Sequence, residues 1–194
     1  DYYRNEGYRD AEVLQDSLYY NQERDDMYID IWVNEGPQYY FGDISFVGNK
    51  VFSDEELAAH LRFEKGDVYS KKSLEEASFQ HIGGLYYDLG YIFASATPKE
   101  VVDPVSPQEL DIEFLMQEGK QAKINEIRIT GNTKTKEKVI RRELRILPGQ
   151  TFNKSLLERS QRDVWMLNYF ANVEPGVQPV DDEKVDLEFK VEEK

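Results

Sequence analysis

Ile127-Arg128-Ile129-Thr130-Gly131-Asn132 repeats the pattern of Ile44-Ser45-Phe46-Val47-Gly48-Asn49, which lies 83 residues earlier. In both stretches apolar residues fill a short run that ends at a Gly-Asn pair. Glycine and asparagine both tolerate a positive φ, so the pair predicts a tight turn directly after a strand. A strand-and-turn signal that recurs at a fixed distance indicates a repeated structural unit.

The same offset relates many other positions along the chain. Residue pairs at this spacing include Leu61 and Leu144, Gly66 and Gly149, Tyr69 and Phe152, Leu74 and Leu157, Tyr86 and Tyr169, and the pairs Gly7-Tyr8 and Gly90-Tyr91. In the last copy a shorter connection reduces the offset to 75, so that Phe114 corresponds to Phe189. We therefore predict three parts: the second half of a truncated unit at 1–37 and complete units at 38–119 and 120–194. We expect the native protein to extend further on its N-terminal side.

Two helices are predicted after the first strand of the middle unit. Ser53 lies three residues before Glu56, the spacing of a capping box, and starts a short helix. Ser70 is placed to cap a longer helix that Gly90 ends. The Gly83-Gly84 pair inside the longer helix predicts a kink or a close contact between helix and sheet.

Two strands complete the unit, at Tyr91–Val102 and Leu110–Gln117. In the second of them apolar and polar residues alternate with period two. The order βααββ predicts an α+β fold in which two helices pack on one face of a small three-stranded mixed sheet. The last copy is similar, but Phe170-Ala171-Asn172-Val173 replaces the Gly90-Tyr91 step there.

Composition excludes several classes of function. The chain carries 38 acidic against 24 basic residues, so nucleic acid is not expected as a partner. It has no cysteine, which excludes disulfides and thiolate metal sites. The acidic runs Glu23-Arg24-Asp25-Asp26 and Asp181-Asp182-Glu183 lack the spacing of a calcium loop and are interpreted as solvated turns. We expect no metal and no cofactor.

Catalysis finds no support in the sequence. His60 and His81 have no serine or cysteine nucleophile context around them, and phosphate-binding loops are missing. We therefore predict that the chain is not an enzyme.

One basic window interrupts the acidic chain. Its candidate contact residues are Lys134, Lys138, Arg141, Arg142 and Arg145. The window is either the solvated face of a short helix or a contact surface for an acidic neighbour, an anionic lipid surface or an acidic partner.

The motifs together resemble a known family. A Gly-Asn turn after the first strand and a Gly-x-x-[Tyr/Phe] step before the long helix, as in Gly66-Asp67-Val68-Tyr69 and Gly149-Gln150-Thr151-Phe152, resemble POTRA domains of the BamA-type outer-membrane protein assembly factors, the surface antigen family. The resemblance covers essentially the whole chain. It implies a periplasmic array that belongs to an outer-membrane protein with a C-terminal membrane barrel. It also implies neighbouring POTRA modules, unfolded outer-membrane proteins and accessory lipoproteins as partners.

The resemblance also implies where partners bind. In POTRA domains the second strand lies at the edge of the sheet, where unpaired N–H and C=O groups can accept another strand by β-augmentation. The candidate partner-binding residues are Tyr91, Ile92, Phe93, Ala94, Ser95, Ala171, Asn172 and Val173. The alternative function is a docking arm of a secretion or translocation pore, or of another envelope protein, without a chaperone-like role.

Overall fold

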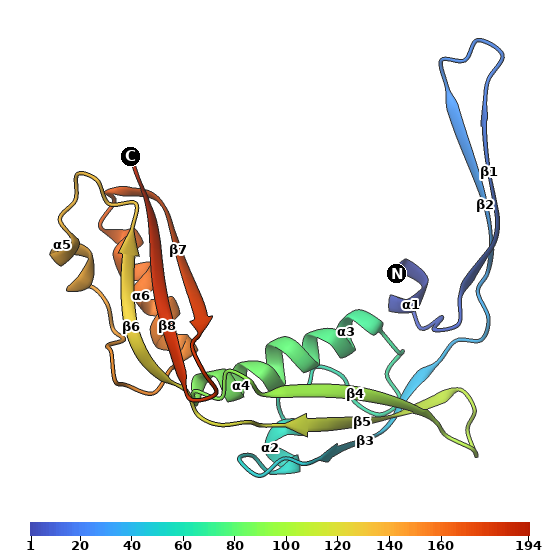
Figure 1. Ribbon diagram of the computed structural model, residues 1–194. Coiled ribbons are helices and arrows are strands. Elements are labelled where there is room, and N and C mark those ends of the chain that lie inside the picture. Colours follow the sequence, from blue (N-terminus) through green and yellow to red (C-terminus); the bar gives the residue numbers. More distant parts are fainter. The chain divides into compact units, whose positions relative to one another are not determined.

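A computed structural model describes residues 1–194 as two compact units (Figure 1). The first unit comprises Asp1–Val47, Ser53–Ser78 and Thr97–Leu115. The second comprises Gly48–Phe52, Phe79–Ala96 and Met116–Lys194. None of the helices is both long enough and apolar enough to cross a bilayer.

The first unit begins with a short helix and a long hairpin. Helix α1 (Tyr2–Asn5) precedes the antiparallel strands β1 (Glu12–Tyr20) and β2 (Met27–Asn34). The side-chain oxygen of Asn21 accepts hydrogen bonds from the N–H groups of Asp25 and Asp26. These bonds stabilise the turn between β1 and β2. The acidic run predicted to form a turn therefore does so.

The middle of the chain has the predicted order βααββ. Its strands β3 (Tyr40–Val47), β4 (Ser95–Val102) and β5 (Glu109–Gln117) form a sheet of order β3-β5-β4, with β3 parallel to β5. Helix α2 (Asp54–Ala58) starts with the predicted capping box, and Ser70 caps helix α3 (Lys71–Glu76). A π-helical segment (Ala77–Ile82) and helix α4 (Gly83–Asp88) follow.

Two expectations for this region need correction. The strand predicted from Tyr91 begins only at Ser95, because residues 91–94 form a turn in which the Ala94 N–H donates to the Tyr91 carbonyl at 3.1 Å. The irregularity predicted at Gly83-Gly84 is the π-helical segment that directly precedes the pair. No close contact accounts for Gly84, since a Cβ placed there would meet open space.

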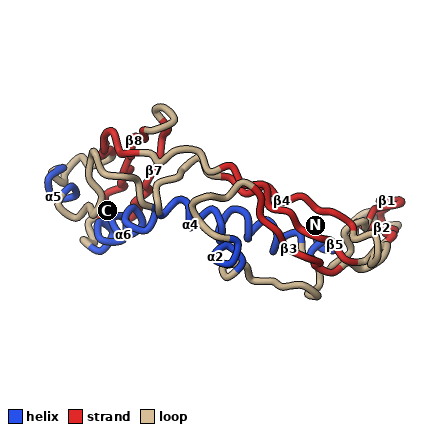
Figure 2. The backbone as a smooth tube through the Cα atoms, turned by 90° about the horizontal axis from the view of Figure 1, so that it is seen from below, coloured by secondary structure: helices blue, strands red, loops and turns tan.

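The last copy of the repeat lies within the second unit. Strands β6 (Lys123–Thr130), β7 (Phe170–Pro179) and β8 (Lys184–Glu193) form a sheet of order β6-β8-β7, with β6 parallel and β7 antiparallel to β8. Helices α5 (Glu137–Arg141) and α6 (Lys154–Met166) connect β6 to β7. Figures 1 and 2 show α6 lying along one face of this sheet.

The core of the last copy follows the period-two pattern of β8. Its alternate residues Val185, Leu187, Phe189 and Val191 are buried together with side chains of both helices. Ile140 of α5 and Val164 of α6 are fully buried in the same cluster. Both helices therefore cover the same face, as the sequence predicts, and the other face of the sheet remains open to solvent.

A glutamate at the end of each third strand holds the Gly-Asn turn of its module. The Glu118 carboxylate accepts from the N–H groups of Lys50 and Val51 at 2.7 and 2.8 Å, and from the Tyr86 hydroxyl at 2.8 Å. Burial acts to raise the pKa of Glu118, but the bonds from Lys50 and Val51 outweigh burial and lower the pKa. Glu118 therefore remains ionised and stabilises the turn.

Glu193 takes the same role 75 residues later. Its carboxylate accepts from the Thr133 hydroxyl at 2.6 Å and from the N–H groups of Lys134 and Thr135 at 2.9 and 2.6 Å. The bond from the Thr133 side chain, followed by those from Lys134 and Thr135, lowers the pKa of Glu193 to about 2. The repeat thus preserves a contact between the two ends of each module.

Replacing Glu193 with glutamine is expected to make stability less dependent on pH in acid. Because the folded-state pKa is depressed, the ionised carboxylate stabilises the native protein above about pH 4.5, and this contribution is lost as the pH falls toward 2. The stability difference between wild type and Glu193→Gln should therefore be present at pH 7 and shrink across that interval in urea titrations. Glu192→Gln is the control, and an equal effect of both variants would contradict the role of Glu193.

A joint recurs where one module meets the next. The Gly7 carbonyl accepts from the Tyr39 N–H at 2.8 Å in the first unit, and the Gly90 carbonyl accepts from the Ala122 N–H at 2.8 Å in the second unit. Both glycines have positive φ, and a Cβ on Gly90 would lie 2.5 Å from Thr151 Cγ2. Glycine is therefore required here by backbone conformation and by close packing.

The joint also includes the preceding helix end. The Asn5 side chain accepts from the Lys72 N–H at 3.0 Å, and the Asp88 carboxylate accepts from the Ser155 N–H at 2.7 Å. Asp88 thereby places a negative charge at the N-terminus of α6, where the unpaired N–H groups favour it. We call these hydrogen bonds and their glycine, together, the helix-end joint.

Candidate partner-binding edges

Two strands offer a free edge of the kind that the sequence analysis assigned to partner binding. Strand β4 ends the order β3-β5-β4, and strand β7 ends the order β6-β8-β7. The predicted residues Ala171, Asn172 and Val173 lie in β7. Of the residues predicted on the other edge, only Ser95 belongs to β4.

The remaining predicted residues lie in the turn before β4. Tyr91, Ile92, Phe93 and Ala94 precede the strand, and Ile92 is buried in the core of the last copy beside Ala122. Burial of Ile92 against a different sheet prevents these four residues from extending β4. The accessible edge is therefore Ser95–Val102.

The direction of each N–H on β4 follows from one hydrogen bond. The Asp103 N–H donates to the Glu109 carbonyl at 3.0 Å, so odd-numbered positions face β5. Successive residues of a strand alternate in direction, and the even positions therefore point to the free edge. These are Ala96, Pro98, Glu100 and Val102, of which only the proline lacks an N–H.

Side-chain interactions on β4 leave its backbone uncovered. Lys99 bonds with the Glu113 carboxylate at 3.0 Å. The Glu100 carboxylate accepts from Arg9 Nε at 2.6 Å and from the Tyr69 hydroxyl at 2.7 Å. Burial, followed by the bond to Glu100, raises the pKa of the Tyr69 hydroxyl, which therefore stays a donor.

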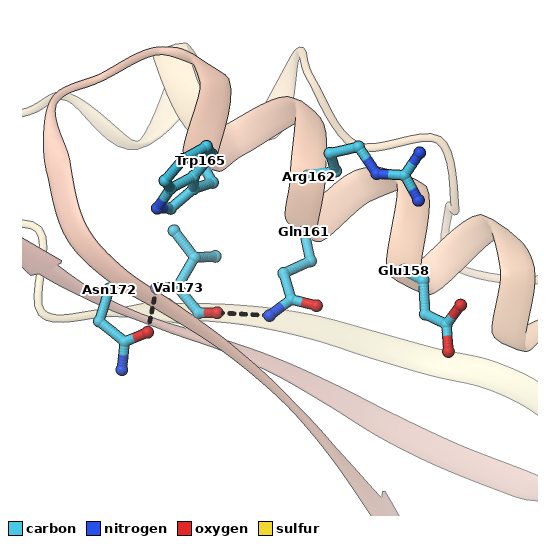
Figure 3. A pocket seen from close by; sticks show the side chains of 6 residues that line it. All are labelled: Glu158, Gln161, Arg162, Trp165, Asn172 and Val173. Atoms are coloured by element: carbon cyan, nitrogen blue, oxygen red, sulfur yellow. Dashed lines mark hydrogen bonds between the residues drawn. The ribbon is translucent and has the colours of Figure 1, made fainter.

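Strand β7 is different, because side chains cover its backbone at Val173 (Figure 3). The Gln161 side-chain amide donates to the Val173 carbonyl at 2.8 Å. The Asn172 side-chain oxygen accepts from the Val173 N–H at 2.9 Å. Both backbone groups of Val173 point away from β8 and already have partners.

A groove of about 520 Å³ lies between α6 and β7. Its lining residues, labelled in Figure 3, are Glu158, Gln161, Arg162, Trp165, Asn172 and Val173. The Trp165 side chain is 58% exposed. The sequence does not identify Gln161 or Trp165 as residues of a site. A sequence signal exists only for Gln161, since the 83-residue offset aligns this glutamine with Ser78, a serine, in the middle copy.

The basic window lies in and around α5, and local carboxylates pair with all three of its arginines. Arg141 Nε bonds with Glu137 at 3.0 Å, Arg142 with Glu143 at 2.9 Å and Arg145 with Asp163 at 2.7 Å. Lys134 and Lys138 are exposed and make no ion pair. The free positive charge of the window is therefore smaller than its composition indicates. No group of side chains is arranged to hold a metal ion.

These features define the class: a tandem array of βααββ modules with free sheet edges and no catalytic constellation. The chain belongs to the POTRA family, since the family model described as surface antigen variable number repeat matches residues 39–119 and 122–194. The family and the α+β fold predicted from the sequence are confirmed by this match and by the structural neighbour described next.

Known proteins similar to the chain are outer-membrane assembly factors. It is 31% identical to the outer membrane protein assembly factor BamA of Nitratidesulfovibrio vulgaris and 30% identical to that of Neisseria meningitidis, covering 99% and 100% of this chain and 24% of each relative. The crystal structure of Haemophilus influenzae BamA POTRA3-5 matches with a TM-score of 0.85 and 26% identity, over 100% of this chain and 76% of that one.

The chain thus spans about a quarter of the length of the curated relatives it matches. The relatives carry the name of assembly factors, in agreement with the prediction that the chain is not an enzyme.

Proposed function

We propose that the chain is the periplasmic POTRA array of an outer-membrane β-barrel assembly factor. It binds unfolded outer-membrane proteins and accessory subunits by adding their extended segments to a free sheet edge. The observation that carries this proposal is the family match combined with a strand whose outward backbone groups remain unpaired. The neighbouring modules and a membrane barrel of the same protein are further proposed partners.

We propose the same modular division that the repeat predicts: part of a module at 1–37 and complete modules at 38–119 and 120–194. The sequence predicts two candidate edges, at Ser95 in β4 and at Ala171–Val173 in β7, and of these two the edge of β4 has outward N–H groups without a partner. Main-chain hydrogen bonds do not depend on the side chains of the bound segment. Strand addition at a sheet edge therefore suits a factor that binds many different clients. The exposed lysines of the basic window are a second proposed contact, for an acidic partner.

Replacing Val102 with proline is expected to weaken the binding of an extended peptide by about tenfold, the effect of one to two lost hydrogen bonds. Val102 points to the free edge, so the substitution removes an N–H that the sheet does not use. The probe is a capped ten-residue peptide that alternates valine and threonine, and its affinity is measured by fluorescence anisotropy.

Val102→Ala keeps the N–H and should bind the peptide as the wild type does. A second control is the same peptide N-methylated at every residue, which has no N–H left to donate to a strand on either of its edges. If Val102→Pro binds as well as Val102→Ala while its amide spectrum stays native, strand addition at β4 is disproved.

A further inference from the structure

The free edge of β7 contains few groups that another strand could use. The Val180 N–H donates to the Lys184 carbonyl at 2.9 Å, so even-numbered positions of β7 face β8. Pairing with β8 is regular from Asn172 to Pro179, and the odd positions therefore point to the free edge. These positions are Val173, Pro175, Val177 and Pro179.

Three of the four outward positions on β7 are unable to donate a hydrogen bond to an added strand. Pro175 and Pro179 have no N–H. The N–H of Val173 is bonded to the Asn172 side chain, and its carbonyl accepts from Gln161. Only Val177 retains an unused N–H. On β4, by contrast, three of four outward positions carry an N–H that no side chain covers.

We infer that strand addition is directed to β4, and that Gln161, Asn172 and the two prolines close β7 against it. This inference rests on the proposed function and assigns the two modules different roles. Proteins protect sheet edges from unwanted pairing with prolines and with groups that cover the edge. An incoming strand at β7 would first have to break both side-chain bonds of Val173, and it would then find an N–H at only one further position.

The helix residue that makes this difference departs from the repeat. Gln161 corresponds to Ser78, and the Ser78 hydroxyl donates to the Leu74 carbonyl of its own helix at 3.0 Å. The Ser78 bond stays within its own helix, whereas the glutamine amide spans from α6 to Val173. The helix of the last copy therefore covers an edge group, and the Ser78 hydroxyl of the middle copy covers none.

The test is nuclear magnetic resonance titration of the chain with the alternating valine–threonine peptide, comparing wild type with the triple variant Gln161→Ala/Asn172→Ala/Pro175→Val. In the wild type we expect the amide signals of Glu100 and Val102 to shift and those of Val173 and Val177 to stay in place. The triple variant should gain binding at Val173 and Val177 by about tenfold or more, since it frees two backbone groups and adds a third.

Gln178→Ala is the matched control, because Gln178 is a β7 glutamine that faces β8 through its backbone and covers no edge group. Hydrogen exchange at the Val173 amide supplies a readout without peptide, and it should be faster in Asn172→Ala than in the wild type. Equal peptide shifts at β7 in the wild type and the triple variant would overturn the inference. Binding of the triple variant at β4 with no binding at β7 would overturn it as well. Absent binding at β4 in the wild type, with binding gained at β7, would instead overturn the proposed function.

Discussion

Replacing Gly131 with alanine is expected to lower the free energy of unfolding by about 2–5 kcal/mol. Gly131 has a φ of +86°, a conformation that costs a residue with a Cβ about 1–2 kcal/mol. A Cβ there would also overlap the backbone carbonyl oxygen of Val191, so β8 or the turn would have to move. Displacing a packed backbone adds about 1–3 kcal/mol. Urea denaturation followed by circular dichroism measures the loss.

Gly149 is the matched control for this prediction. Its φ of +84° is almost the same, but a Cβ built on it meets nothing within 4 Å. Gly149→Ala should therefore show the conformational cost alone, about 1–2 kcal/mol. Equal losses in the two variants would show that the carbonyl of Val191 imposes no constraint.

The truncation of Phe189 to alanine is expected to cost about 3–5 kcal/mol, the range for a large core side chain. Phe189 is fully buried at the centre of the last sheet, where β8 is flanked by β6 and β7, and no neighbour can collapse fully into the space left behind. Phe79→Ala is the control, since the Phe79 side chain is 80% exposed and should lose less than about 0.5 kcal/mol. Similar losses at both positions would contradict this account of the core.

The elements of each module could be predicted because their signals are local. The capping box at Ser53, the alternation along β8 and the turn at Gly48-Asn49 all act over a few residues, and the repeat supplied independent copies of the last two. The close approach of Val191 to Gly131 could not be read in the same way. It joins two strands that are adjacent in space and 60 positions apart in the chain, and only the φ of the turn has a sequence signal.

The start of β4 and the closure of β7 depend on contacts between elements. Ile92 fits the alternation of a strand, yet its side chain packs in the core of the last copy. In the sequence Gln161 is one of several polar residues on a helix. Its role depends on the packing of α6 against β7, where its side-chain amide donates to the Val173 carbonyl. Periodicity identifies which face of a helix is polar, but it carries no information on which backbone group a polar side chain will reach.

The helix-end joint has a mechanical consequence. In the second unit a backbone hydrogen bond from Ala122 to Gly90 and two bonds from Ser155 to Asp88 tie the last turn of α4 to the following module. A pulling force on that module is therefore transmitted to the end of α4 through these hydrogen bonds as well as through the connecting segment between β5 and β6.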